Sequence, residues 1–219
     1  KRPADVEFDT AVFTNLTRDH LDYHGTMEAY GAAKAALFDW PGLSAAVINL
    51  DDPKGAELAA LVRDKGQGLI TVGHGADADL RLLAHRYDAT GQDLRLSYQG
   101  VIYQTRLSLI GGFQSENVIL AAGLVIAAGS RAGEVVATLP ALTGVRGRMQ
   151  LAATRKNGAS VFVDYAHTPD ALEKVLSTIH QLRKGGGRII TVCGCGGDRA
   201  GFVSVSTILR RWTVPCYRR

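Results

Sequence analysis

Lys34 occupies a position at which a charged amine is unexpected. The segment Thr26–Phe38 is predicted to be a helix, because its apolar positions recur at spacings of three and four. The stripe consists of Met27, Tyr30, Gly31, Lys34, Leu37 and Phe38. Most lysines on such a stripe cover apolar surface with their alkyl stem while the ammonium reaches water. The alternative is a functional amine, because a buried ammonium must be paired or must lose its charge.

A run of polar residues follows the strand that is predicted at Thr10–Leu16. In open α/β sheets, ligands bind beyond the carboxyl ends of the strands, which is where this run lies. Within the run, His20 could bind a metal ion through one ring nitrogen while a neighbour orients the other. A loop histidine with a hydrogen-bonded neighbour is the plainer interpretation of the Asp19-His20 pair.

The elements that must position these residues alternate between strand and helix. We expect buried strands at Thr10–Leu16, Ala45–Leu50 and Leu69–Val72, and helices at Thr26–Phe38 and Glu57–Lys65. Such βαβ units predict a parallel sheet. The segments that begin at Leu80, Leu94 and Val101 instead alternate apolar and polar residues, and glycine-containing turns separate them. They predict an antiparallel meander with one exposed face.

The second half of the chain predicts a separate unit. Two helices, Ser115–Ala128 and Arg131–Leu139, lead to a hinge at Gly144–Gln150. A new βαβ unit then follows, with a strand at Ser160–Tyr165, a helix at Pro169–Arg183 that starts with proline, and a strand at Arg188–Val192. A glycine-rich turn, CGCGGDR, ends this last strand.

Composition indicates an ordinary soluble globular protein. Of 219 residues, 46% are hydrophobic and 21% are charged. No apolar run is long enough to span a bilayer, and Lys1–Thr10 does not resemble a signal peptide, so we expect no membrane insertion. The three cysteines have neither disulfide-framework nor zinc-site spacing, which favours a reducing compartment, the cytoplasm.

The net charge of +4 does not predict nucleic-acid binding. Residues 200–219 contain four arginines and no acid, so the remainder has 21 basic and 21 acidic residues. Binding to a phosphate backbone needs a clustered basic face, and only this tail offers one.

Five segments of the chain resemble the Mur ligase family. They are TNLTRDHLDYHGTMEAYGAAKAALF, GGFQSENVILAAG, GVRGRMQ, DYAHTPDALEKVL and CGCGGDR, in the family's order over roughly residues 1–199. The first is most similar to the branch that adds the third amino acid to UDP-MurNAc-L-Ala-D-Glu. Several motifs with their spacing preserved are far more specific than one motif alone.

The resemblance implies a fold and a domain division. Residues 1–147 are expected to form the C-terminal part of the central ATPase domain, an α/β domain with a mixed sheet. Residues 148–199 are expected to begin the Rossmann-like C-terminal domain, and 200–219 to be a divergent tail, as after a reading-frame change. The family's glycine-rich ATP loop is expected upstream of residue 1, so we expect the isolated chain to be inactive.

The resemblance also assigns roles to individual residues. It implies that His20 is a magnesium ligand and that Lys34 is carbamylated, which makes it an anion that can hold a second magnesium ion. Carbamylation requires a neutral amine, which burial favours. In the same way, Asn117 is expected to read adenine and Arg2 to face the UDP-MurNAc-dipeptide. The nucleotide is expected to contact Arg148 and Asp164, with Tyr165 and His167 beside them.

The activity that the resemblance implies is formation of an amide bond with ATP and Mg²⁺ as cofactors, in peptidoglycan synthesis and hence in cell shape and division. The substrates would be the UDP-MurNAc-dipeptide and a diamino acid, with meso-diaminopimelate favoured over lysine, and the enzyme is expected to be a monomer. Two departures concern the hinge, where Val145-Arg146 replaces the family's Val-Pro and Gln150 replaces an acid. Two alternatives are a folylpolyglutamate synthase-like ligase and a non-catalytic nucleotide-binding remnant.

Overall fold

A computed structural model describes residues 7–17, 21–88, 90–183 and 187–192 of the chain. These residues divide into two compact units. The first unit lies within 1–86, 93–107 and 114–142, and the second lies within 87–92, 108–113 and 143–219. In the described ranges, the helices are all too short or too polar to cross a bilayer.

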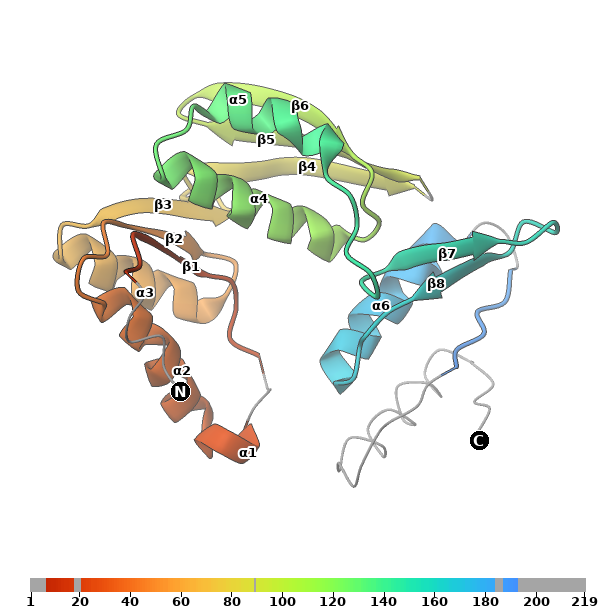
Figure 1. Cartoon of the computed structure of the whole chain (residues 1–219), viewed down its shortest axis with the longest axis horizontal. Coiled ribbons are helices and arrows are strands. Elements are labelled where there is room, and N and C mark those ends of the chain that lie inside the picture. The colour runs from red at the N-terminus through yellow and green to blue at the C-terminus, as the bar shows by residue number, and fades with distance from the viewer. Residues whose placement is uncertain (1–6, 18–20, 89, 184–186, 193–219) are drawn as a thin grey trace. The chain divides into compact units, whose positions relative to one another are not determined.

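A six-stranded mixed sheet runs through the first half of the chain (Figure 1). In sheet order the strands are β1 (Thr10–Phe13), β2 (Ala45–Asn49), β3 (Gly68–Gly73), β4 (Leu80–Asp88), β5 (Gly91–Tyr98) and β6 (Val101–Leu107). The pairs β1–β2, β2–β3 and β3–β4 are parallel. Connections as short as those after β4 and β5 can join only antiparallel neighbours. The predicted combination of a parallel sheet with a meander is therefore confirmed.

A reciprocal contact closes the short connection between the parallel strands β3 and β4. The buried Thr71 donates from both its backbone nitrogen and its Oγ1 to Asp79 Oδ2, at 2.8 and 2.7 Å. The Asp79 backbone nitrogen donates to Thr71 Oγ1 at 3.0 Å. Parallel neighbours usually need a longer crossover, and these three hydrogen bonds fix the short connection in place here.

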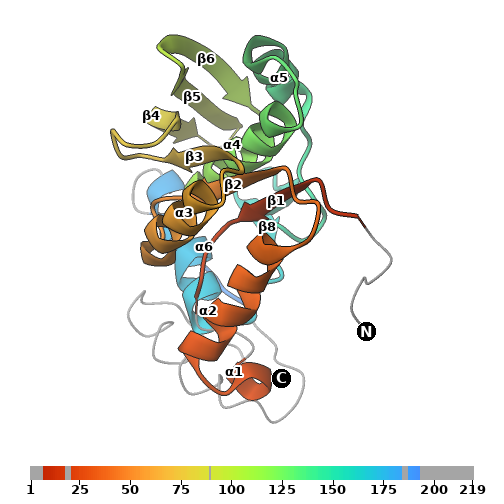
Figure 2. The ribbon, with the colours of Figure 1, turned by 90° about the vertical axis from the view of Figure 1, so that its left-hand side faces the viewer.

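Helices cover both faces of the parallel strands. Alternate residues of a strand point to opposite faces. On one face, Ala46 and Ile48 of β2 belong to a core with residues of α3 (Pro53–Asp64) and of the short 3₁₀ helix η1 (Ala36–Asp39), which continues α2 (Met27–Ala35) (Figure 2). On the other face, Val47 meets α4 (Gly112–Ala127), where a Cβ on Gly123 would lie 2.9 Å from Val47 Cγ1.

The described residues of the second unit include an antiparallel pair of strands and a helix. Strands β7 (Gln150–Thr154) and β8 (Ser160–Val163) pair with each other, and α6 (Pro169–Leu182) follows. Thr168 caps α6 by accepting from the Ala171 backbone nitrogen at 3.3 Å. The core of this unit contains Ile110, Met149 and Val175, with Phe113, Phe162, Ala166, Ile179 and Leu182 packed against it. Elsewhere in the described residues, the helices are α1 (Leu21–His24), α5 (Ala132–Thr138) and the 3₁₀ helix η2 (Leu139–Ala141).

Two strand predictions need correction. The first strand ends at Phe13 rather than Leu16, because the backbone of residues 14–16 bonds to side chains instead of a neighbouring strand. The strand predicted at Arg188–Val192 is wrong, since these residues hold only a single bridge at Thr191 and the sheet of this unit is the β7–β8 pair. The CGCGGDR turn lies outside the described residues.

The structure differs from the prediction at three further elements, α3, α1 and β7. The helix expected at Glu57–Lys65 starts earlier, because α3 begins at Pro53 with Asp52 as its N-cap. The helix α1 and the strand β7 were not predicted. β7 begins inside the predicted hinge, at Gln150, and its sequence QLAAT lacks the strong apolar pattern of the other strands.

Candidate functional site

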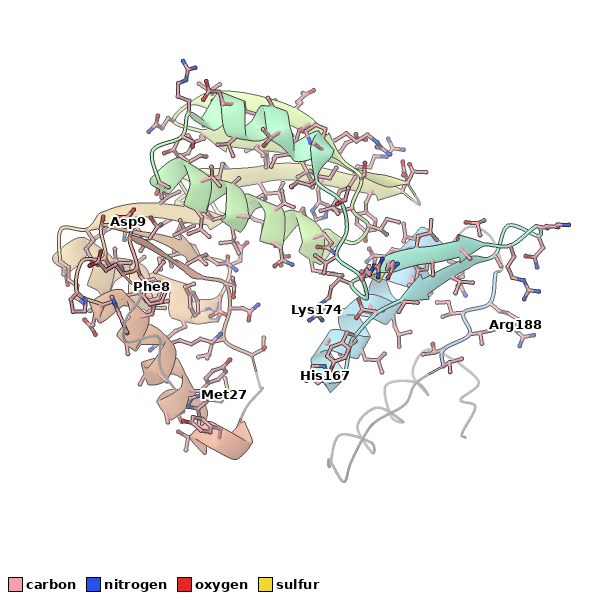
Figure 3. The ribbon with its side chains drawn as sticks, viewed as in Figure 1. Phe8, Asp9, Met27, His167, Lys174 and Arg188 are labelled. Atoms are coloured by element: carbon pink, nitrogen blue, oxygen red, sulfur yellow. The ribbon has the colours of Figure 1, made fainter. Side chains whose placement is uncertain are left out.

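The helix α2 presents Lys34 toward the interior, as the sequence predicts. Thr26 caps α2 by accepting from the Ala29 backbone nitrogen at 3.1 Å, and Gly25 precedes it with a φ of 76°. The stripe that carries Lys34 is buried or half-buried, whereas the opposite positions of the helix are exposed: Glu28, Ala29, Ala32 and Ala33. Met27 starts this helix (Figure 3).

The amine of Lys34 has partners that residue types alone could not indicate. Its Nζ donates to the backbone carbonyl of Asn15 at 2.7 Å. It also lies 4.9 Å from the ring centroid of Tyr30 and 5.9 Å from that of Phe13. The negative faces of aromatic rings attract a cation at these distances. Lys34 is half-buried, so it is neither an unpaired buried charge nor a freely solvated one.

The strand end beside Lys34 is held by side chains that the sequence reasoning did not select. Asn49 donates from Nδ2 to the Thr14 carbonyl, and the Leu16 backbone nitrogen donates to Asp52 Oδ2, both at 2.7 Å. The signal that could have identified Asp52 is the Asp-Pro pair, because aspartate at the N-cap and proline at the first position are typical of a helix start.

The second unit brings together the residues predicted around the nucleotide. Asp164 accepts from the backbone nitrogens of Met149 and Ala166, at 2.7 and 2.8 Å. The Arg148 guanidinium lies 5.6 Å from the ring centroid of Tyr165. The rings of Tyr165 and His167 lie 5.2 Å apart (Figure 3 labels His167).

These contacts leave two groups open to a ligand. Arg148 is exposed, and Tyr165 is 68% exposed. An exposed guanidinium over an exposed ring offers one positive charge and one flat apolar face, which suit a phosphate and a planar ring respectively. The half-buried carboxylate of Asp164 keeps acceptor capacity, because two ionised oxygens have about four lone-pair sites and two are used.

Asn117 is exposed on α4 in the first unit, so its amide can reach a ligand. Its neighbours Ser115 and Val118 are buried, which fixes the rotation of the helix about its axis. His20 and Arg2, the predicted metal ligand and substrate contact, lie outside the described residues.

Lys34 as an unmodified amine does not suit a magnesium ion. Within the described ranges, His, Cys, Asp and Glu form no group of three that could hold a metal ion. The carboxylates after β2 are engaged, since Asp51 accepts from the backbone and Nδ1 of His74 while Asp52 caps α3. Magnesium prefers oxygen ligands, so the ammonium of Lys34 would repel it and a carbamate at the same atom would supply two oxygens.

Two family models match the chain. The Mur ligase middle domain matches residues 1–125, and the Mur ligase glutamate ligase domain matches residues 147–210. The chain belongs to the Mur ligase family. This confirms the resemblance and the α/β fold expected from it.

Similar Mur ligases are known from several bacteria. The UDP-N-acetylmuramoyl-L-alanyl-D-glutamate–2,6-diaminopimelate ligase of Chromobacterium violaceum is 44% identical over 194 residues, which are 89% of this chain and 39% of that protein. The ligase of the same name from Pseudomonas syringae pv. tomato is 46% identical over 202 residues, with 90% and 40% covered. The chain thus spans about two fifths of these relatives' length.

Solved structures show the same fold. A structure of a ligase of that name has a TM-score of 0.71 and 35% identity, and covers 97% of this chain and 43% of its own. The folylpolyglutamate synthase of Mycobacterium tuberculosis has a TM-score of 0.66 and 25% identity, with 84% and 41% covered. Sequence identity, rather than fold similarity, therefore separates the two kinds of ligase.

Proposed function

We propose that this chain is part of a cytoplasmic ligase that adds meso-diaminopimelate to UDP-MurNAc-L-Ala-D-Glu in peptidoglycan synthesis. The observation that carries the proposal is the 44% and 46% identity to two ligases named for this reaction. The lower identity of 25% to the folylpolyglutamate synthase makes a folate ligase the weaker candidate.

The proposed reaction proceeds through an acyl phosphate. ATP transfers its γ-phosphoryl group to the γ-carboxylate of the D-glutamyl residue, which releases ADP. The amine of the diamino acid attacks the activated carbonyl, and the tetrahedral intermediate loses phosphate and a proton to give the amide. Most of the catalytic effect in such transfers comes from positioning and from charge stabilisation.

Lys34 is the proposed anchor of the cation site. Magnesium, when bound, would offset negative charge on the phosphoryl group. The support for Lys34 is its fixed amine, held at the carboxyl end of β1 by the Asn15 carbonyl. A carbamate there forms when the neutral amine attacks carbon dioxide and loses a proton. His20 remains a proposed magnesium ligand, and Arg2 a proposed contact of the UDP-MurNAc-dipeptide.

Nucleotide contacts are proposed for residues of each unit separately. Asn117 would pair with the adenine edge through its exposed amide. Arg148 and Tyr165, with His167 beside them, would meet the phosphates and a planar group, and Asp164 would accept a ribose hydroxyl. The support for Asp164 is that its two backbone contacts fix its orientation while leaving lone pairs free.

Substitution of Lys34 in the complete ligase tests the proposal. We expect Lys34→Ala to lower kcat by about 10²-fold or more, because an anion that holds charge in the transition state is lost. Short carboxylates such as acetate should restore part of the rate in Lys34→Ala. Lys34→Arg should not be restored, because a guanidinium stays charged and forms no such carbamate.

The matched control is Lys65→Ala. Lys65 also donates to a backbone carbonyl, that of Phe38 in η1, at 3.1 Å. Phe38 lies beyond the C-terminal end of α2, so the enzyme with Lys65→Ala should retain its activity. A Lys34→Ala enzyme with full activity and normal magnesium dependence would contradict the proposal.

Calorimetric titration of the complete protein distinguishes the alternatives. The proposed ligase should bind the UDP-MurNAc-dipeptide and ATP. Folate binding without dipeptide binding would favour the folylpolyglutamate synthase-like ligase. ATP binding with neither substrate would favour a non-catalytic nucleotide-binding remnant.

A further inference from the structure

The backbone of residues 14–16 is held without pairing to another strand. The Thr14 carbonyl accepts from Asn49 Nδ2, and the Leu16 backbone nitrogen donates to Asp52 Oδ2, each at 2.7 Å. Asn49 is the last residue of β2 and Asp52 is the N-cap of α3. Two side chains from neighbouring elements therefore fix both ends of a three-residue segment.

The two holding residues are themselves fixed. Asp52 Oδ1 accepts from the Lys54 backbone nitrogen at 2.9 Å, so one carboxylate caps α3 and holds the segment at once. Asn49 Oδ1 accepts from the Asp51 backbone nitrogen at 3.0 Å. A Cβ on Gly55 would lie 1.9 Å from the Asn49 carbonyl oxygen, so the start of α3 is seated directly against the end of β2.

The carbonyl between the two held positions is the acceptor of Lys34. Asn15 has its carbonyl oxygen 2.7 Å from Lys34 Nζ. Its neighbours in the chain are the two residues whose backbone groups Asn49 and Asp52 bind. The place of the amine is thus set by residues that do not touch it.

We propose that Asn49 and Asp52 are positioning residues for the Lys34 amine, acting through the backbone of residues 14–16. The proposal rests on the proposed function only for the chemical role of Lys34. The placement itself follows from the hydrogen bonds.

Asp52→Asn separates the two tasks of this carboxylate. Asparagine is as good an N-cap as aspartate, so its Oδ1 can keep the bond to Lys54. Its other terminal atom is an amide nitrogen, a donor, which cannot accept from the Leu16 backbone nitrogen. The variant therefore removes the link to the segment while the helix keeps its cap.

The measurement is the acetylation rate of each lysine in the 219-residue chain, followed by mass spectrometry in buffer free of carbon dioxide. The hydrogen bond from the Leu16 backbone nitrogen to the charged Asp52 carboxylate is lost in Asp52→Asn. Loss of such a bond should raise the population in which the segment is released, and the Lys34 amine is free to react, by about tenfold or more. We expect the Lys34 rate in Asp52→Asn to rise by about that factor. The rates at Lys65 and Lys174 should stay constant, whereas general loosening would raise them too.

Asp51→Asn is the matched control. It makes the same change of charge one residue away, but Asp51 bonds to His74 and not to the segment. Its Lys34 rate should equal that of the unsubstituted chain. Equal Lys34 rates in Asp51→Asn and Asp52→Asn would overturn the proposal.

Asn49→Ser provides the second test should Asp52→Asn not fold. The shorter side chain cannot span the distance to the Thr14 carbonyl, and Asn49 is only half-buried, so little packing is lost. The Lys34 rate should again rise selectively. No change at Lys34 in a folded Asn49→Ser chain would also overturn the proposal.

A carbon-13 spectrum in labelled bicarbonate distinguishes this inference from the proposed function. The unsubstituted chain should give a lysine carbamate signal that Asp52→Asn weakens and Asp51→Asn leaves unchanged. Absence of the signal in every chain would count against carbamylation, while the acetylation rates would still decide the positioning. A signal of equal strength in all three chains would contradict the positioning alone.

Discussion

At the scale of single residues, the position of Lys34 and its partners differ in how far they could be predicted. The helical stripe placed the residue on the inward face, because apolar spacing reports the direction of side chains. Its partner is a backbone carbonyl, which every residue possesses and which therefore leaves no mark in the sequence. The same reasoning explains why Asn49 was missed, since its acceptor is also a carbonyl.

Asn117→Ala tests the adenine contact at this scale. In the complete ligase we expect the KM for ATP to rise roughly fivefold, the effect of one neutral hydrogen bond of about 1 kcal/mol. The kcat should change little, because the contact is present in both the ground and the transition state. Steady-state kinetics with varied ATP measures both constants. Glu116→Ala, on the same turn of α4, is the control, and an Asn117→Ala enzyme with normal KM would remove the residue from the site.

At the scale of elements, the buried strands and long helices could be predicted, and their ends could not. Pattern predicts an element where many residues agree, as in β2 or α6. An end depends on one or two hydrogen bonds, such as the contact of Leu16 with Asp52 that stops β1 early. Short elements with a weak pattern, α1 and β7, were missed for the same reason.

Gly55→Ala tests how closely α3 approaches β2. Alanine is a better helix former than glycine by up to about 1 kcal/mol, which favours the variant. The added methyl would lie 1.9 Å from a backbone oxygen, and overpacking of this kind costs about 1–3 kcal/mol. We therefore expect a net loss of stability of about 1–2 kcal/mol in urea unfolding.

Gly133→Ala is the control for this change. Gly133 also lies in the first turn of a helix, α5, but an added Cβ would meet only Tyr103 Cε1, at 3.9 Å. It should leave stability unchanged or raise it slightly. A Gly55→Ala chain as stable as Gly133→Ala would show that α3 can shift away from β2 at little cost.

At the scale of the whole molecule, the fold class could be anticipated from the alternation of elements, while the domain boundary at residue 147 stays a prediction. The nucleotide residues illustrate the limit. Arg148 and Tyr165 are close in the structure although the sequence gives no spacing signal for the pair, because β7 and β8 pair antiparallel with Gln150 opposite Val163, which brings the residues flanking this pair together. Only the family resemblance named both.

The pH dependence of stability is a second property at this scale. Burial raises the pKa of Tyr98 above its ordinary value of 10.0, with Asp79 and Tyr103 adding to the shift. A group whose pKa is higher in the folded state stabilises the fold fully below its unfolded pKa and loses that contribution as pH rises through the folded value. We therefore expect the free energy of unfolding to fall above about pH 10.

Tyr98→Phe should reduce this alkaline loss, because the ring stays and the ionisable hydroxyl is gone. Urea unfolding at a series of pH values, followed by circular dichroism, measures it, and phenolate absorbance reports the titration directly. Tyr87, whose pKa burial also raises, should account for part of the remaining loss. An identical alkaline profile in the Tyr98→Phe chain would contradict the assignment to Tyr98.

The hold on residues 14–16 has a consequence for how this segment tolerates change. Asn49 binds the Thr14 carbonyl oxygen and Asp52 binds the Leu16 backbone nitrogen. Both contacts are to main-chain atoms, so neither involves the side chain of Thr14 or Asn15. Both of these side chains are exposed. The hold on this segment therefore does not depend on the side chains at its first two positions. The side chains that matter for the geometry of this segment are instead those of Asn49 and Asp52, which lie far from it in the sequence.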